Sequence, residues 1–209
     1  MMHDFIVPFL KDTDQIRLSG NGEPFASQHN RRIMKATKGN ITPSINLHTN
    51  AMLCDERNWR DYRSYGRVNE IHVSIDAATP KTNAAIRRGG VFVRLLRNLE
   101  LIAFLRSTGE INRIKLSFVI QAVNFREMPA FVALGRQFGA DEVFFSNIQL
   151  WTQAKSADQY RAVQVWRNGH PMNPELITIM REKKSNDPIV SSGNLSDKAA
   201  PSYASMNMP

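Results

Sequence analysis

Strand-like segments in which apolar and polar residues alternate recur along the chain, and this pattern limits the available folds more than any other feature. β-Branched residues, Leu and Phe occur with period-two spacing in five segments: residues 15–19, 44–49, 70–75, 113–120 and 142–147. Segments with helical periodicity lie between them. A strand followed by a helix, repeated in series, predicts an α/β protein with a parallel sheet.

Two of the helical segments are especially clear. In residues 91–106 the apolar positions form one stripe, and Gly109 follows where a helix would end. In residues 127–138, Pro129 lies in the first turn and Gly139 follows the last turn. We expect the helices to pack against the apolar face of the sheet.

The strands have one polar face, whereas parallel strands are normally apolar on both faces. In residues 70–75, for example, Ile71 and Val73 alternate with His72 and Ser74. The polar face must meet water or a ligand, because buried polar groups without partners cost roughly 1–3 kcal/mol each. We therefore predict an open, partial βα barrel of parallel strands with outer helices and a polar interior. A solvated sheet face without a ligand is the alternative.

Polar residues and a glycine follow several of these strands. Gly22, Glu23, Asn50, Asp76 and Asn124 all lie at or just past the predicted carboxyl ends. Ligand sites in parallel α/β folds lie at this edge of the sheet. These five residues are therefore candidates for a binding site.

The chain is basic, with 27 Lys and Arg against 19 Asp and Glu and a net charge of +8. Such an excess can favour nucleic acid or an anionic ligand. The arginines are scattered over predicted helices, however, so solvated helix faces explain the excess as well. The strands also lack the aromatic and basic pattern typical of readers of single-stranded RNA.

The sequence gives indications of location and domain organisation. The amino terminus lacks the features of a signal peptide, and no apolar run approaches the roughly 18 residues of a membrane span, so we expect a cytoplasmic protein. Cys54 is the only cysteine, which excludes a disulfide framework or a cysteine-based metal site within this chain. We expect residues 1–183 to form the partial barrel and residues 184–209 to be unstructured.

Five segments within residues 10–150 resemble the radical S-adenosylmethionine (radical SAM) family. They read GNGEP at 20–24, LHTNAML at 47–53, HVSIDAATP at 72–80 with IRRGG at 86–90, SFVIQAVN at 117–124 and VFFSNIQLW at 143–151. In order, they are similar to the family's glycine-glutamate element and its third to sixth strands. The resemblance implies a partial barrel whose first strand is missing here and which binds S-adenosylmethionine (SAM) at its strand ends.

The resemblance also implies roles for single residues. Gly20 and Gly22 would let the backbone approach the methionine part of SAM, and Glu23 would accept hydrogen bonds from its ammonium group. Ser74 and Asp76 would hold the ribose hydroxyls. The whole implied set of cofactor-binding residues is Gly20, Gly22, Glu23, Pro24, Asn50, Ser74, Asp76 and Asn124.

Details of the glycine-glutamate turn leave alternatives open. Asn21 stands where the family usually has its first glycine, which departs from the family's pattern. A carboxylate at the amino end of a helix that begins near Ala26 is a second explanation for Glu23. We expect Pro24 to end the preceding strand, because proline cannot continue a ladder.

The family's chemistry needs a 4Fe-4S cluster, which three cysteines in a C-x3-C-x2-C motif hold upstream of this turn. Only 19 residues precede Gly20, and none is a cysteine. We therefore expect a chain truncated at its amino end, with residues 15–19 as an unpaired sheet edge. With an upstream cluster motif the protein would generate a 5′-deoxyadenosyl radical and act on a peptide or small metabolite. The chain as given is expected to be inactive.

Other functions stay open. The chain could be a cluster-free SAM-binding or vestigial protein, a basic nucleic-acid-binding protein, or a hydrolase with Glu23 and Asp76 as acid and base. His48 and His72 are interpreted as hydrogen-bonding residues of the polar interior rather than metal ligands. The two arginines at 87–88 are candidates for binding a substrate carboxylate.

Overall fold

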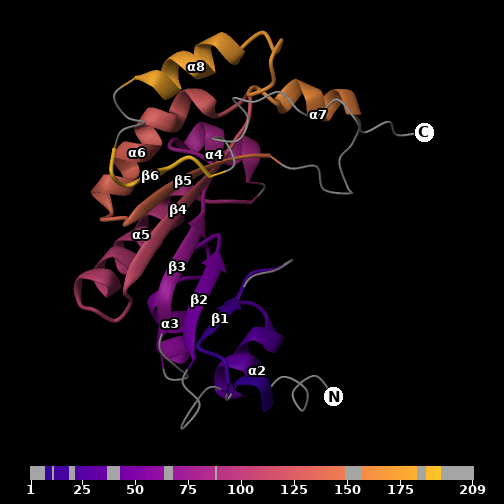
Figure 1. The fold of residues 1–209 in the computed structure, drawn as a ribbon. Helices are drawn as coiled ribbons and strands as arrows, with labels where there is room; N and C mark the ends of the chain where they lie inside the picture. The colour runs from indigo at the N-terminus through magenta and orange to yellow at the C-terminus, as the bar shows by residue number, and fades with distance from the viewer. Residues whose placement is uncertain are drawn as a thin grey trace.

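The computed structural model describes residues 8–10, 12–18, 22–36, 43–63, 68–87, 89–148, 157–182 and 187–193. Within them, six strands form one parallel sheet and lie side by side in chain order (Figure 1). The strands are β1 (Gln15–Leu18), β2 (Ser44–Thr49), β3 (Val68–Ser74), β4 (Arg113–Ile120), β5 (Glu142–Asn147) and β6 (Val190–Ser191). The predicted α/β class and the five predicted strands are confirmed.

Two strands differ from the sequence-based prediction. β6 lies in the segment for which the sequence predicts no regular structure, and its Val190 pairs with Val143 of β5. Two residues are too few to show an alternation, so only the pairing reveals a strand of this length. β3 begins at Val68 and ends at Ser74 instead of spanning residues 70–75.

Helices connect the strands. They are α2 (Gln28–Ala36), α3 (Glu56–Arg63), α4 (Pro80–Ile86), α5 (Phe92–Ser107), the 3₁₀ helix η1 (Phe125–Glu127), α6 (Met128–Gln137), α7 (Ala157–Val163) and α8 (Asn173–Arg181). The two clearest predicted helices are confirmed as α5 and α6. Gly109 and Gly139 follow them with φ angles of 76° and 64°, the left-handed conformation that favours glycine. None of the helices described is long and apolar enough to cross a membrane.

One face of the sheet is apolar and covered by helices, as the alternation predicts. Leu47, Val73 and Leu116 lie on this face and are fully buried. α5 and α6 run along it, and their apolar side chains join the same hydrophobic core (Figure 1). Burying one such side chain contributes roughly 1.5–3 kcal/mol, so this face stabilises the sheet and fixes its register.

The opposite face is polar and half-buried. Its register places His48 beside His72, His72 beside Lys115, and Lys115 beside Glu142. Lys115 and Glu142 form an ion pair at 3.0 Å, with only 19% and 15% of their side chains exposed. The sheet therefore has the polar interior that the predicted open barrel requires.

β1 lies at one edge of the sheet. Among the described strands it pairs with β2 alone, through parallel bonds from Gln15 to Leu18. The edge position expected for this strand is confirmed. On its other side, no described strand pairs with the backbone donors and acceptors of β1.

Candidate functional site

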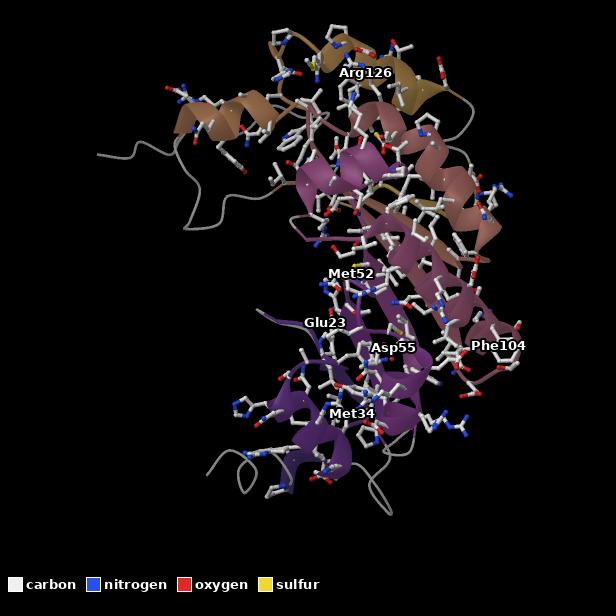
Figure 2. The ribbon with its side chains drawn as sticks, turned by 180° about the vertical axis from the view of Figure 1, so that it is seen from behind. Glu23, Met34, Met52, Asp55, Phe104 and Arg126 are labelled. Carbon is white, nitrogen blue, oxygen red and sulfur yellow. The ribbon has the colours of Figure 1, made fainter. Side chains whose placement is uncertain are left out.

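Glu23 lies next to the end of β2 and is held there by neutral donors. Its Oε1 accepts a hydrogen bond from the Thr49 hydroxyl at 2.5 Å, and its Oε2 accepts one from the backbone N–H of Asn50 at 3.1 Å. Figure 2 shows Glu23 beside the loop that holds Met52. Within the described residues Glu23 forms no ion pair, so its negative charge is available to a cationic ligand.

The turn around Glu23 follows from local capping. The Ser27 hydroxyl accepts from the backbone N–H of Asn30 at 3.2 Å and caps α2, which makes Ser27 rather than Glu23 the side-chain cap of this helix. The Glu23 carbonyl accepts from the N–H of Ala26 and of Ser27, closing the turn. The Tyr62 hydroxyl donates to the Pro24 carbonyl and ties this turn to α3.

The structure places Pro24 and Gly22 in the turn before α2. Pro24 does not end β1, because the strand already ends at Leu18 and Pro24 lies in the following turn. A Cβ placed on Gly22 would meet no atom within 4 Å, so the space beside this glycine is open. Gly20 and Asn21 lie outside the described residues, and their predicted roles stay predictions.

Asp76 is fixed by contacts from two directions just past the end of β3. Its Oδ1 accepts the backbone N–H of Val119 at 2.7 Å, and its Oδ2 pairs with Arg87 Nη2 at 2.5 Å. The same Arg87 nitrogen donates to the Ser74 hydroxyl oxygen at 2.6 Å. Asp76 has a φ of 67° and is 5% exposed, so a non-glycine residue in an unfavourable conformation is held by its neighbours.

Asn124 supports Asp76 from behind. Its Nδ2 donates to the carbonyls of Asp76 and Val119, both at 2.9 Å, and its Oδ1 accepts from the N–H of Gln121 at 2.7 Å. Asn124 is 0% exposed. Its side chain therefore acts on the backbone on either side of the site, and any effect on a ligand would pass through Asp76.

Glu127 is a residue of this region that the sequence analysis does not identify. Its carboxylate accepts hydrogen bonds from the Ala78 and Thr79 N–H groups at 2.6 and 3.2 Å, and from the Thr79 and Thr82 hydroxyls at 2.6 and 2.5 Å. Burial opposes ionisation, but these hydrogen bonds outweigh it and lower the pKa of Glu127. Its position three residues after Asn124, past the end of β4, is the signal that could have found it.

A cavity of about 450 Å³ opens beside these residues. Asn50 and Ser74 line it together with Asn83, Arg87 and Gly90. Within the described residues, Asn83 Oδ1 and Arg87 Nε are buried without hydrogen-bond partners, so they can still form hydrogen bonds with a ligand. The volume lies within the usual range for small-molecule sites, roughly 300–1,000 Å³.

The structure thus divides five of the predicted site residues into three groups. Asn50 and Ser74 line the cavity. Glu23 and Asp76 each bond directly to a cavity-lining residue, Glu23 to Asn50 and Asp76 to Arg87. Asn124 acts from outside the cavity. Arg87, expected only as a partner of a substrate carboxylate, pairs with Asp76 in this structure.

His48 and His72 lie on the polar face of the sheet, with parallel rings whose centroids are 4.2 Å apart. Burial, together with the neighbouring His48 and Lys115, lowers the pKa of His72 to about 3. Burial, and then Arg87, also lowers the pKa of His48. Both rings are therefore neutral near pH 7. Among the described residues, no group of three or more His, Cys, Asp or Glu could hold a metal ion.

Cys54 does not fit the role of a cluster ligand. It is fully buried in the hydrophobic core, and this burial, with Glu23 and Asp55 nearby, raises the pKa of its thiol. The thiolate that metal coordination needs is therefore disfavoured. As the only cysteine of the chain, it also cannot supply three ligands.

The fold and the site together define a class, an open parallel βα sheet with a polar cavity at the carboxyl ends of its strands. This is the partial barrel that the resemblance to the radical SAM family predicts. No family model and no curated protein matches the chain.

Solved structures do match the fold. SuiB of Streptococcus suis bound to S-adenosylmethionine has 14% identity and a TM-score of 0.56 over 86% of this chain and 39% of SuiB. SuiB bound to the precursor peptide SuiA has 13% identity and a TM-score of 0.56, over 87% and 40%. TYW1 with a lysine-pyruvate adduct bound has 16% identity and a TM-score of 0.53, over 81% and 50%. The chain therefore spans between two fifths and half of the length of these proteins.

Proposed function

We propose that this chain binds SAM across the carboxyl ends of β1 to β4, as the SAM-binding part of a radical SAM-type enzyme. The observation that carries the proposal is the placement of two carboxylates of different character at one sheet edge. Glu23 has no cationic partner among the described residues, while Asp76 lies beside a hydroxyl and a guanidinium. The shared fold with SAM-bound SuiB supports the choice of ligand.

The two carboxylates suit different parts of SAM. Glu23 would accept hydrogen bonds from the ammonium group, a charge-assisted contact with a carboxylate already oriented by Thr49 and Asn50. Ser74 and Asp76 would accept from the ribose hydroxyls. Arg87 donates to both of them in this structure, so it would share these acceptors with the ribose or turn towards the cavity.

Gly20, Gly22, Pro24, Asn50 and Asn124 complete the proposed site. Gly22 leaves open space for the methionine part, and the Asn50 side chain lines the cavity wall. Asn124 would position the site through the backbone of Asp76. Gly20 keeps the role that the family resemblance implies for it.

The residues of this chain do not fit a 4Fe-4S cluster. A cluster of the family's type would need three cysteines from outside the chain, and radical chemistry would depend on them. The substrate would be a peptide or a small metabolite; one structural neighbour is bound to a precursor peptide. SAM binding itself would depend on the residues named above.

Isothermal titration of the 209-residue chain with SAM, in buffer without iron, tests the proposal. We expect saturable binding to one site. Ser74→Ala should weaken this binding at least tenfold, while Ser107→Ala, an exposed serine at the end of α5, should leave it unchanged. No measurable binding, or equal affinities for the two variants, would contradict the proposal.

A further inference from the structure

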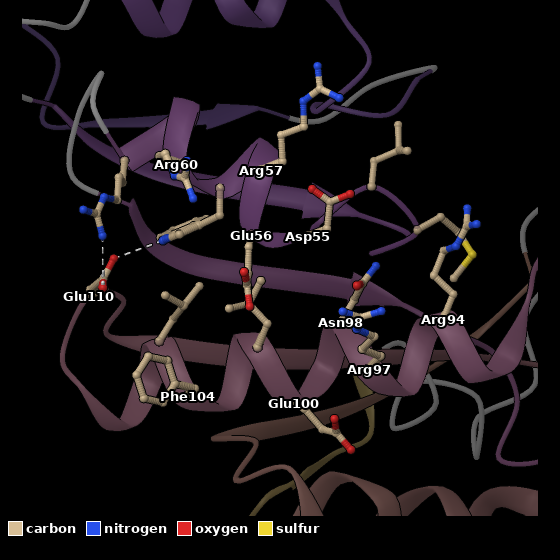
Figure 3. Close-up of a pocket in the computed structure, with 16 residues that line it drawn as sticks. Asp55, Glu56, Arg57, Arg60, Arg94, Arg97, Asn98, Glu100, Phe104 and Glu110 are labelled. Carbon is tan, nitrogen blue, oxygen red and sulfur yellow. Dashed lines mark hydrogen bonds and ion pairs between the residues drawn. The ribbon is translucent and has the colours of Figure 1, made fainter.

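A second and larger hollow lies between α3 and α5, on the helix layer (Figure 3). Its volume is about 1090 Å³. We refer to it as the α3–α5 groove. Met52 lines both this groove and the smaller cavity, so one end of the groove reaches the loop that follows β2. The proposed SAM site makes no use of the rest of this surface.

The α3–α5 groove has apolar side chains along its α5 wall. Leu101, Phe104 and Leu105 line it, and Leu53 contributes from the loop before α3. Phe104 is 59% exposed, which is a large apolar area for a side chain on a regular helix. Leu53 and Leu101 are half-buried and Leu105 is buried beneath them, so the groove has an apolar wall of which Phe104 is the exposed part.

Arginines that form no ion pair among the described residues border the groove on both sides. Arg57 and Arg60 project from α3, and Arg94 and Arg97 project from α5 (Figure 3). Within the described part of the chain, none of these four guanidinium groups forms an ion pair or a side-chain hydrogen bond. The fifth arginine of the lining, Arg63, pairs with Glu110 at 3.6 Å.

The acidic residues of the lining are partly engaged. Asp55 accepts from the backbone and side-chain nitrogens of Asn58 at 2.9 and 3.1 Å, and so caps α3. Glu110 accepts from Trp59 Nε1 at 3.0 Å and also pairs with Arg63. Of the acidic residues that line the groove, Glu56 and Glu100 form no ion pair within the described part of the chain, and Figure 3 shows Glu100 on the side of α5 turned away from α3.

We propose that the α3–α5 groove docks an acidic amphipathic helix of another protein. Four exposed guanidinium groups without ion-pair partners among the described residues complement acidic side chains, and the apolar wall with Phe104 complements an apolar helix face. α5 has 16 residues and is therefore about 24 Å long, which matches a partner helix of similar length. Nucleic acid would meet the arginines but would leave Phe104 and Leu101 against a polar backbone.

A synthetic peptide provides the probe. It is about 16 residues long, with Leu on one helical face and Glu and Ala on the other, and it carries fluorescein. There are two control peptides. One has the same composition in a scrambled order that spreads Leu around the helix. The other has the same length and carries Lys in place of Glu. Fluorescence anisotropy with the full chain, at ionic strengths of about 0.05 and 0.2 M, measures the affinities.

We expect the acidic amphipathic peptide to bind saturably and at least tenfold more tightly than either control. R94E/R97E should weaken its binding at least tenfold, and Phe104→Ser should weaken it several-fold. R161E/R181E is the matched control, because it reverses two exposed arginines on α7 and α8. It should retain the affinity for the acidic peptide apart from a small change that depends on salt. SAM titration of the same variants shows whether the other site is intact.

Three results would overturn the proposal. The first is an absence of saturable binding, and the second is equal affinity for the amphipathic and scrambled peptides, which would reduce the effect to charge attraction. The third is tighter, R94E/R97E-sensitive binding of a single-stranded oligonucleotide of similar length, which would make the surface a nucleic-acid site. None of these results depends on whether the chain binds SAM.

Discussion

Glu23 and Asp76 lie at the same edge of one sheet, yet their surroundings differ in kind. Among the described residues, Glu23 is held by one hydroxyl and by backbone N–H groups, and no cation compensates its charge. Asp76 is more deeply buried and has both a backbone N–H and the guanidinium of Arg87. Among the described residues the charge of Glu23 is therefore uncompensated, whereas the charges of Asp76 and Arg87 cancel.

This difference indicates how one edge can receive a ligand with two unlike parts. A carboxylate without a cation attracts an ammonium group, whereas a carboxylate already paired with Arg87 can accept from neutral hydroxyls without burying an uncompensated charge. The supporting residues differ as well. The Glu23 region depends on Thr49 and Asn50, while the Asp76 region is held from behind by Asn124 and Glu127.

The largest effect that separates the two regions should come from Glu127. Glu127→Ala removes the acceptor of four hydrogen bonds that hold residues 78–82, and we expect a loss of about 3 kcal/mol in unfolding free energy. Urea denaturation followed by circular dichroism measures it. Glu100→Ala on the exposed side of α5 is the control and should change stability by less than about 0.5 kcal/mol. Equal effects of the two substitutions would show that Glu127 does not hold this turn.

The ion pair of Asp76 provides the next largest effect. In a double-mutant cycle of Asp76→Asn and Arg87→Met, we expect a coupling free energy of about 1.5 kcal/mol, because each single change leaves the partner uncompensated. The same urea titrations give all four corners of the cycle. Additive effects would mean that the Arg87 guanidinium does not neutralise Asp76 in solution, and the contrast with Glu23 would disappear.

The fold could be predicted from the sequence because its signals are local and repeated. Period-two alternation located β1, β2, β4 and β5 to within a residue, and glycine positions located the ends of α5 and α6. β6 has two residues and shows no period of its own. Its existence depends on pairing with β5, which is far from it in the sequence.

The candidate site was predicted less completely. Position at the strand ends identified Glu23 and Asp76, but the contacts that distinguish them come from elsewhere in the chain. Arg87 lies 11 residues after Asp76 and Glu127 lies 49 residues after Ala78, so no local pattern links these partners. Side-chain pairing across strand ends needs the three-dimensional register, which alternation alone does not supply.

A ligand experiment sharpens the comparison further. Glu23→Gln keeps the shape of the side chain but removes its charge, and we expect it to weaken SAM binding about tenfold, or about 1.4 kcal/mol. Adenosine, which lacks the ammonium group, should bind both proteins equally. Glu100→Gln serves as the charge-matched control in the same calorimetric titrations. A loss of adenosine affinity in Glu23→Gln would show that the two regions do not divide the ligand as proposed.

The smallest expected effect comes from the stacked rings of His48 and His72. His48 lies on β2, whose end is next to Glu23, and His72 lies on β3, which leads to Asp76. Burial lowers the pKa of His72 to about 3 from its ordinary 6.5. Between these values the unfolded chain binds a proton that the folded protein does not bind, so stability falls as the pH drops below 6.5. Between pH 7.5 and 5.5 we expect the wild type to lose about 1 kcal/mol through this residue.

His72→Gln removes the titrating group while keeping a polar side chain on the same face of β3, so its stability should fall less over this pH range than that of the wild type. Urea titrations of both proteins at the two pH values measure the difference. His48→Gln should flatten the dependence as well, since burial and Arg87 also lower the pKa of His48. Identical pH dependence in all three proteins would mean that the rings are hydrated in solution, and the polar face between the two regions would then be open to water.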